Sequence, residues 1–160
     1  MSVLDPYFVK HGKVIEGLAE AAEQIPEDKI MWKPYDKAIP WIRLIDHTSI
    51  SIRHLIIKAL KEEPFDFPAC FFDESNQAKT PKEVAKAMRD SWEELKSLIQ
   101  SQPEDFYKKE VAFTKGRKMT VEQIVWFNYE HNVHHRGQAW IYARMNGVTP
   151  PAIWGTEQPD

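Results

Sequence analysis

The sequence has very little cysteine, no long apolar run and no excess of basic charge. Cys70 is the single cysteine among 160 residues, which excludes an intramolecular disulfide and fits a reducing compartment, so we expect a cytoplasmic protein. No stretch approaches the ~18 apolar residues of a membrane span, and the N-terminal residues lack the apolar core of a signal peptide. The net charge is −3, and basic residues are interleaved with acidic ones. We therefore expect neither a membrane nor a nucleic acid as partner.

Prolines divide the chain into four stretches in which apolar residues recur every three or four positions, as on one face of a helix. The predicted helices cover about residues 6–24, 40–63, 80–102 and 121–146. Four amphipathic helices of this length favour an all-α four-helix bundle. The connections between helices two and three and between helices three and four are long for a bundle. The chain length predicts a single domain over residues 1–160.

Local signals mark the helix ends. Thr80 and Thr120 are each followed three residues later by Glu or Gln, the pattern of a capping box. Asn146-Gly147 is a natural helix stop, because glycine adopts the left-handed cap conformation easily. The segment PFDFPACFFDES at 64–75 contains too many prolines for a long helix, and we expect it to pack across one end of the fold. Residues 104–118 are expected to be polar and irregular, with a turn at 115–117.

Residues 131–138 read HNVHHRGQ and contain three of the six histidines. His131 and His135 are four apart and about 40° from each other around a helix, so they can bind one metal ion. His134 points about 100° away from His135. The stripe through His131 also carries aliphatic and aromatic residues, so we expect the pair to face the core: Ile124, Phe127, Ile141, Tyr142 and Met145.

A third ligand must come from a facing helix. His47 and His54 on the second helix and His11 on the first are the candidates, and spacing does not choose among them. The competing interpretation is a set of hydrogen-bonded core histidines or a partly solvated helix face. Gln138 is the best-placed hydrogen-bond partner for the outer nitrogen of a ligand. We find no organic cofactor site and no catalytic group beyond the metal itself.

The stretch EHNVHHRGQAWIYARMNGVTPP at 130–151 resembles the C-terminal signature of the DinB/YfiT-like family of four-helix-bundle proteins. In that family a further histidine follows a tryptophan and an apolar run in the second helix, and WIRLIDH at 41–47 has this placement. The resemblance covers about residues 4 to 153. The sequence departs from the family pattern at Thr48, where many relatives have leucine.

The resemblance implies a divalent metal, nickel or zinc, held by His47, His131 and His135. It also implies a homodimer, for which Trp126, Trp140 and Phe8 are candidate surface residues. Related branches include thiol transferases and thiol-dependent maleylpyruvate isomerases. We therefore expect a metal-dependent enzyme, of thiol-transferase or hydrolase type, that acts on a small molecule such as a low-molecular-weight thiol. A non-catalytic metal- or ligand-binding stress protein is the alternative, and a purely structural bundle is a third.

Overall fold

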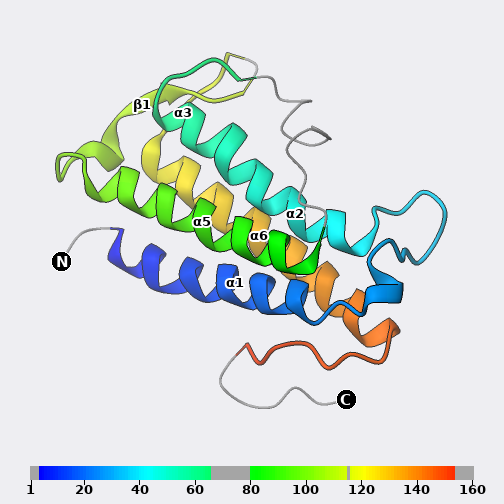
Figure 1. Cartoon of the computed structure of the whole chain (residues 1–160). Helices are drawn as coiled ribbons and strands as arrows, with labels where there is room; N and C mark the ends of the chain where they lie inside the picture. The colour runs from blue at the N-terminus through cyan, green and yellow to red at the C-terminus, as the bar shows by residue number, and fades with distance from the viewer. Residues whose placement is uncertain (1–3, 66–79, 115, 154–160) are drawn as a thin grey trace.

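The computed structural model describes residues 4–65, 80–114 and 116–153, and these residues form a four-helix bundle (Figure 1). Helix α1 packs against α5 and α6, and α2 packs against the same two helices from the other side. This arrangement confirms the predicted all-α four-helix bundle. The principal helices are α1 (Asp5–Glu23), α2 (Trp41–Ser51), α5 (Pro81–Gln100) and α6 (Val121–Met145), with short 3-10 turns η1 (Glu27–Lys29) and η4 (Phe106–Lys108) in the connections.

Capping boxes start the two helices where the sequence predicts them. The Thr80 hydroxyl accepts a hydrogen bond from the Glu83 backbone N–H at 3.2 Å, and the Glu83 carboxylate accepts one from the Thr80 N–H at 2.8 Å. Thr120 and Gln123 make the equivalent pair of bonds at the start of α6. The end of α6 is also as predicted, since Gly147 has a φ of 70° directly after the last turn.

The second helix contains a π-helical segment that the sequence does not predict. After Ser51 the backbone continues as η2 (Ile52–Ile57), a π-helix, and then as the short α3 (Lys58–Leu60). A π-helical segment has more residues per turn than an α-helix, so side chains beyond Ser51 are rotated away from their α-helical directions. Hydrophobic spacing does not reveal this change, because Leu55, Ile56 and Ile57 are consecutive and all buried. Three apolar residues in a row have no periodicity that would distinguish a π-helix from an α-helix.

A small hairpin within residues 110–120 overlaps the segment that the sequence predicts to be irregular. Strand β1 (Glu110–Ala112) pairs antiparallel with β2 (Lys118–Thr120). Three-residue strands are too short for a recognisable alternation, and this hairpin depends on tertiary packing, with Val111 buried against the bundle. The predicted segment at 64–75, including Cys70, lies outside the described residues except for its first two positions.

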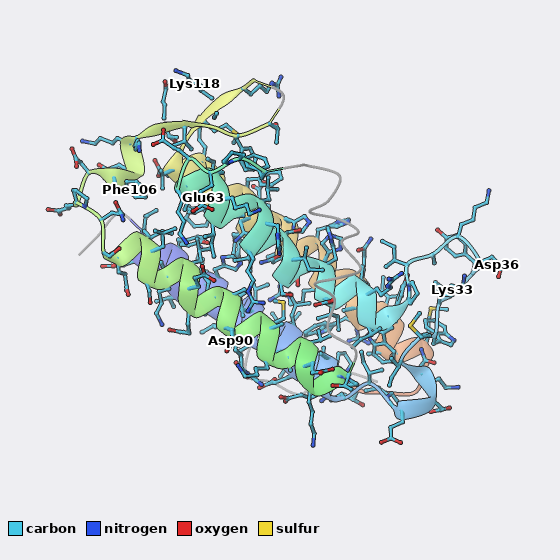
Figure 2. All side chains as sticks on the ribbon, turned by 45° about the horizontal axis from the view of Figure 1, so that its top comes forward. Lys33, Asp36, Glu63, Asp90, Phe106 and Lys118 are labelled. Carbon is cyan, nitrogen blue, oxygen red and sulfur yellow. The ribbon has the colours of Figure 1, made fainter. Side chains whose placement is uncertain are left out.

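Side chains from all four helices fill the core. Its fully buried members include Ile15, Leu18, Trp41, Ile45, Ile52, Ile56, Met88, Leu95 and Ile124. At the surface, Arg89 of α5 reaches two carboxylates of α1, Glu16 at 2.6 Å and Glu23 at 2.7 Å. Figure 2 shows polar side chains at opposite ends of the bundle, with Lys118 on the hairpin and Lys33 and Asp36 on the connector before α2. None of the described helices is long and apolar enough to cross a bilayer.

Candidate metal centre

Helices α2 and α6 bring His47, His131 and His135 together, although 84 residues separate His47 from His131. The Nε2 atom of His131 lies 3.2 Å from Nε2 of His47 and 3.1 Å from Nε2 of His135. Nitrogen ligands about 2.0–2.1 Å from one ion, with angles between octahedral and tetrahedral, would be about 2.8–3.4 Å apart. Both distances from His131 lie in this range, and the three nitrogens all lie within 4.8 Å of one another, close enough to hold one ion.

The hydrogen bonds at the outer nitrogens support the same interpretation. Nδ1 of His135 lies 2.8 Å from Gln138 Oε1, and Nδ1 of His131 lies 3.2 Å from Asn132 Oδ1. An amide oxygen only accepts, so each ring carries its proton on Nδ1 and directs the lone pair of Nε2 inward. Two lone pairs facing each other repel unless a proton or a cation lies between them. The donor set fits a divalent ion.

The environment keeps these rings neutral, which metal binding requires. Burial, together with the neighbouring His131 and His135, lowers the pKa of His47 to about 3. Burial also lowers the pKa of His135 to about 4 and that of His131 below its usual value. The amides of Asn132 and Gln138 are uncharged, so neither adds a negative charge next to the ligands. An ion bound here would keep its positive charge and have coordination positions left for a small molecule.

The other candidate histidines lie outside this cluster. His134 is exposed and contacts the edge of the His135 ring, with centroids 5.1 Å apart. His54 is half-buried on η2, where the π-helical turn ends the α-helical phase that it would otherwise share with His47. His11 is fully buried on α1 and hydrogen-bonds to Tyr7 and Asn132. Of the three candidates for a third ligand, the structure places His47 with the pair on α6.

The expectation that the whole His131 stripe faces the core is wrong. Phe127 is 38% exposed, Ile141 58% and Met145 57%. The buried face of α6 is instead Val121, Ile124, Val125, Asn128, Asn132, Ala139, Trp140 and Ala143. The histidines lie at the shoulder of this face, towards α2, which leaves the metal centre near the protein surface. Asn132 is a buried polar residue that was not predicted from the sequence, although Asn128 and Asn132 are four apart and in phase with Ile124.

Thr48 is accommodated without disturbing the centre. Its side chain is completely buried, and its hydroxyl donates to the Ile45 carbonyl at 2.6 Å and lies 2.8 Å from the Met88 sulfur. The polar atom of Thr48 is therefore satisfied inside its own helix and against α5. This departure from the family pattern does not affect the position of His47.

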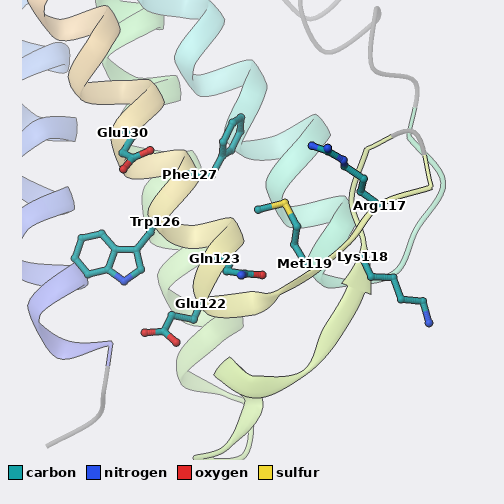
Figure 3. Close-up of a pocket in the computed structure, with 8 residues that line it drawn as sticks. All are labelled: Arg117, Lys118, Met119, Glu122, Gln123, Trp126, Phe127 and Glu130. Carbon is teal, nitrogen blue, oxygen red and sulfur yellow. The ribbon is translucent and has the colours of Figure 1, made fainter.

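An open groove of about 690 Å³ lies between the β1–β2 hairpin and the first half of α6 (Figure 3), and none of the three clustered histidines lines it. Arg117 and Lys118 contribute positive charge from the hairpin, and Glu122 and Glu130 contribute negative charge from α6. Phe127 links the groove to the histidine cluster, because it lines the groove and its ring stacks on His131 at an interplanar angle of 21°. In Figure 3 the Phe127 ring points towards α2, whereas Trp126 and Glu130 lie on the other side of α6.

Fold and site together define a helical-bundle protein with a three-histidine cluster between its second and fourth long helices. The DinB family model matches residues 6–160, and the chain belongs to the DinB family. Protein YjoA of Bacillus subtilis (strain 168) is 26% identical over 148 residues, which cover 89% of this chain and 88% of YjoA. The crystal structure of YjoA covers 97% of this chain and is itself covered completely, with a TM-score of 0.71 and 22% identity.

Two further solved structures share the fold at lower sequence identity. YfiT from Bacillus subtilis, a probable metal-dependent hydrolase with an unusual four-helix-bundle topology, has a TM-score of 0.73 and 16% identity over 90% of this chain and 87% of YfiT. A mycothiol-dependent maleylpyruvate isomerase variant has a TM-score of 0.63 and 14% identity over 92% of this chain and 62% of the isomerase. At these identities the comparisons show the fold alone.

Proposed function

We propose that this protein binds one divalent transition metal, nickel or zinc, through His47, His131 and His135, and uses it to act on a small molecule. The observation that carries the proposal is the convergence of three imidazole nitrogens within 4.8 Å of one another, with Nε2 of His131 3.2 Å from His47 and 3.1 Å from His135, while the outer nitrogens of His131 and His135 face amide oxygens. A structural histidine pair would need only one proton between two rings. Here two inward lone pairs, on His131 and His135, face each other and a third neutral imidazole, and a cation between the rings would satisfy all three.

Metal-dependent hydrolysis is the first reaction class that we propose. Such an ion, when bound, supplies Lewis acidity, which polarises a carbonyl and lowers the pKa of a coordinated water or thiol. Burial disfavours the charged form of the three rings, and no carboxylate among the described residues joins the cluster. YfiT, which shares the fold, is a probable metal-dependent hydrolase. The groove beside the hairpin has room for a small molecule, and its lining residue Phe127 stacks on His131.

Thiol transfer is the second class, and the shared fold of the mycothiol-dependent isomerase favours it. The same neutral ligand set suits a substrate thiol, because coordination to a cation stabilises the thiolate. Metal or ligand binding without turnover, as in a stress protein, is the alternative to both enzyme classes. Activity assays with zinc- or nickel-loaded protein on simple esters and amides, and on a low-molecular-weight thiol with an epoxide, separate the three.

Metal content tests the proposal directly. Protein purified without an affinity tag and dialysed against nickel or zinc should contain about one ion per chain, by elemental analysis. His131→Ala should lose that ion. His134→Ala is the matched control, because it removes a neighbouring exposed imidazole from the same helix and should retain the ion. Equal metal content in both variants, or none in the unsubstituted protein, would contradict the proposal.

We also propose that the protein is a cytoplasmic homodimer. The single cysteine supports a reducing compartment. Ile141 and Met145 lie one turn apart on α6 and are both more than half exposed, so they offer an apolar surface to a second copy. Of the residues considered for this role, Trp140 is buried and donates a hydrogen bond to the Pro151 carbonyl, and Trp126 and Phe8 are partly buried. Light scattering of Ile141→Glu should give a monomer where the unsubstituted protein gives a dimer.

A further inference from the structure

A chain of hydrogen bonds leads from the candidate metal ligand His131 through the bundle core to α1. Nδ1 of His131 lies 3.2 Å from Asn132 Oδ1. Asn132 Nδ2 lies 2.8 Å from His11 Nε2, and His11 Nδ1 lies 2.8 Å from the Tyr7 hydroxyl. The chain therefore joins two helices through four polar side chains, and only His131 belongs to the metal centre.

The inner members of this chain are among the most buried polar groups of the described residues. His11, Tyr7 and Asn132 all have 0% exposed surface. Aromatic rings surround the His11 imidazole, with ring-centroid distances of 4.8 Å to Trp92 and 5.8 Å to Tyr129. Burying polar groups in such surroundings is costly unless each one is paired. Apolar residues at the same positions would fill the interface without that cost, so the polar chain calls for a role beyond packing.

The protons along this chain can be ordered in two directions. In the first, His131 donates from Nδ1 to Asn132 Oδ1, Asn132 donates to His11 Nε2, and His11 donates from Nδ1 to the Tyr7 oxygen. In the second, the Asn132 carboxamide is rotated by 180°, Tyr7 donates to His11 Nδ1, His11 donates from Nε2 to Asn132 Oδ1, and Asn132 donates to His131 Nδ1, so the proton of His131 lies on Nε2. Only the first direction leaves a lone pair on Nε2 for a metal ion. The Asn132 orientation in the structure, with Oδ1 towards His131, is that of the first direction.

Neutral His11 is required for the first direction, because its Nε2 must accept from the Asn132 amide. Burial lowers the pKa of His11 to about 3, so the ring is neutral at physiological pH. Burial also raises the pKa of the Tyr7 hydroxyl, which remains protonated. The carboxamide of Asn128 lies beside that hydroxyl, although not in the geometry of a regular hydrogen bond. Each donor in the series from His131 through Asn132 to His11 thus faces an acceptor.

We infer that His11 is a positioning residue of the metal centre: it fixes the Asn132 amide so that His131 presents the lone pair of Nε2 to the metal. This inference rests on the proposed metal site. His11 touches neither the metal ligands nor a substrate, and it acts entirely through Asn132. Such outer partners of a ligating histidine set the ring's tautomer, and their loss lowers metal affinity by about 10–100-fold.

A double-mutant cycle on metal affinity tests the connection. Ni²⁺ or Zn²⁺ titration of Asn132→Leu should give affinity about 10–100-fold weaker than that of the unsubstituted protein. His11→Leu should weaken affinity about 3–10-fold, and His11→Gln, whose amide oxygen can accept from Asn132, should recover part of that loss. In the Asn132→Leu background, His11→Leu should have almost no further effect, because the two residues act in series. Additive losses would overturn the inference.

A tautomer measurement tests the same inference without any metal. Long-range ¹⁵N–¹H NMR of the metal-free protein should show His131 protonated on Nδ1, and His11→Leu should shift its population towards the Nε2–H form. Val14→Ala, a buried truncation on α1 one turn after His11, is the control for general loosening and should leave both tautomer and affinity unchanged. An unaltered His131 tautomer in His11→Leu would overturn the inference. Failure of the unsubstituted protein to bind metal would instead overturn the proposed function. The NMR measurement on the metal-free protein would still test whether His11 sets the tautomer of His131.

Discussion

The Nε2 atoms of His131 and His135 lie 3.1 Å apart while the opposite nitrogen of each ring faces an amide oxygen. The two rings occupy successive turns of α6, so helical geometry brings them to this distance without strain. The amide oxygens hold the protons on the outer side, and the inner side is left with two lone pairs. This relationship is what distinguishes a ligand pair from two histidines that share a proton.

Gln138 should contribute to metal affinity through His135. Replacing it with leucine removes the acceptor of the His135 Nδ1–H, so we expect about 10-fold weaker Zn²⁺ or Ni²⁺ binding in a calorimetric titration. Gln100→Leu makes the same chemical change at an exposed position of α5 and should leave affinity unchanged. Equal affinity of the Gln138→Leu and unsubstituted proteins would show that the 2.8 Å contact does not orient the ligand.

The stability of the metal-free protein should fall as the pH drops below about 6.5. The folded-state pKa of His11 is about 3 and its ordinary value is 6.5, so the unfolded chain takes up a proton in this range and the folded chain does not. Stability is therefore fully present above pH 6.5 and is lost as the pH falls towards the folded pKa. One fully buried histidine contributes at most about 1.4 kcal/mol per pH unit.

Chemical denaturation between pH 6.5 and 5 measures this slope. His11→Leu should make it shallower, because the substituted residue does not titrate in either state; the remaining slope comes from the three clustered histidines, whose folded-state pKa values are also lowered. His134→Leu removes an exposed histidine and should leave the slope as it is. The same slope in all three proteins would mean that His11 does not carry the pH dependence.

The capping box of α5 should account for a measurable part of the stability. Thr80→Ala removes the hydroxyl that accepts from the Glu83 N–H, and we expect the free energy of unfolding to fall by about 1 kcal/mol. Thr80→Ser should retain most of the stability. Ser97→Ala removes a hydroxyl from an exposed position inside the same helix and should change stability by less than about 0.5 kcal/mol. A loss of stability in Ser97→Ala equal to that in Thr80→Ala would argue against the cap.

Two isoleucines of α6 should differ strongly in their contributions to the free energy of unfolding. Ile124 is completely buried and Ile141 is 58% exposed, although both lie on the stripe that the sequence assigns to the core. Ile124→Ala should lower the free energy of unfolding by about 2–5 kcal/mol. Ile141→Ala should change it by less than about 0.5 kcal/mol, measured by urea denaturation at a protein concentration where the chain is monomeric. Similar losses for both variants would place Ile141 in the core.

Much of the fold could be read from local patterns. The capping boxes at Thr80 and Thr120 and the stop at Gly147 depend on a few neighbouring residues, so the sequence predicts them directly. The π-helical turn at Ile52–Ile57 and the three-residue strands could not be predicted in this way. Both are maintained by packing against distant parts of the chain, and neither has a periodicity long enough to detect.

The same distinction between local patterns and tertiary packing applies to the candidate metal site. The sequence by itself determined that His131 and His135 share a helix face, because a separation of four residues fixes their angle wherever the helix lies. The choice of His47 over His54 and His11 came first from the family resemblance, and in the structure it follows from how α2 crosses α6. Only the tertiary structure decided that the pair lies at the shoulder of α6 and that His11 meets Asn132, 121 residues away. The physical reason is that helical phase is local, whereas the direction in which a helix faces its neighbours depends on the packing of the whole bundle.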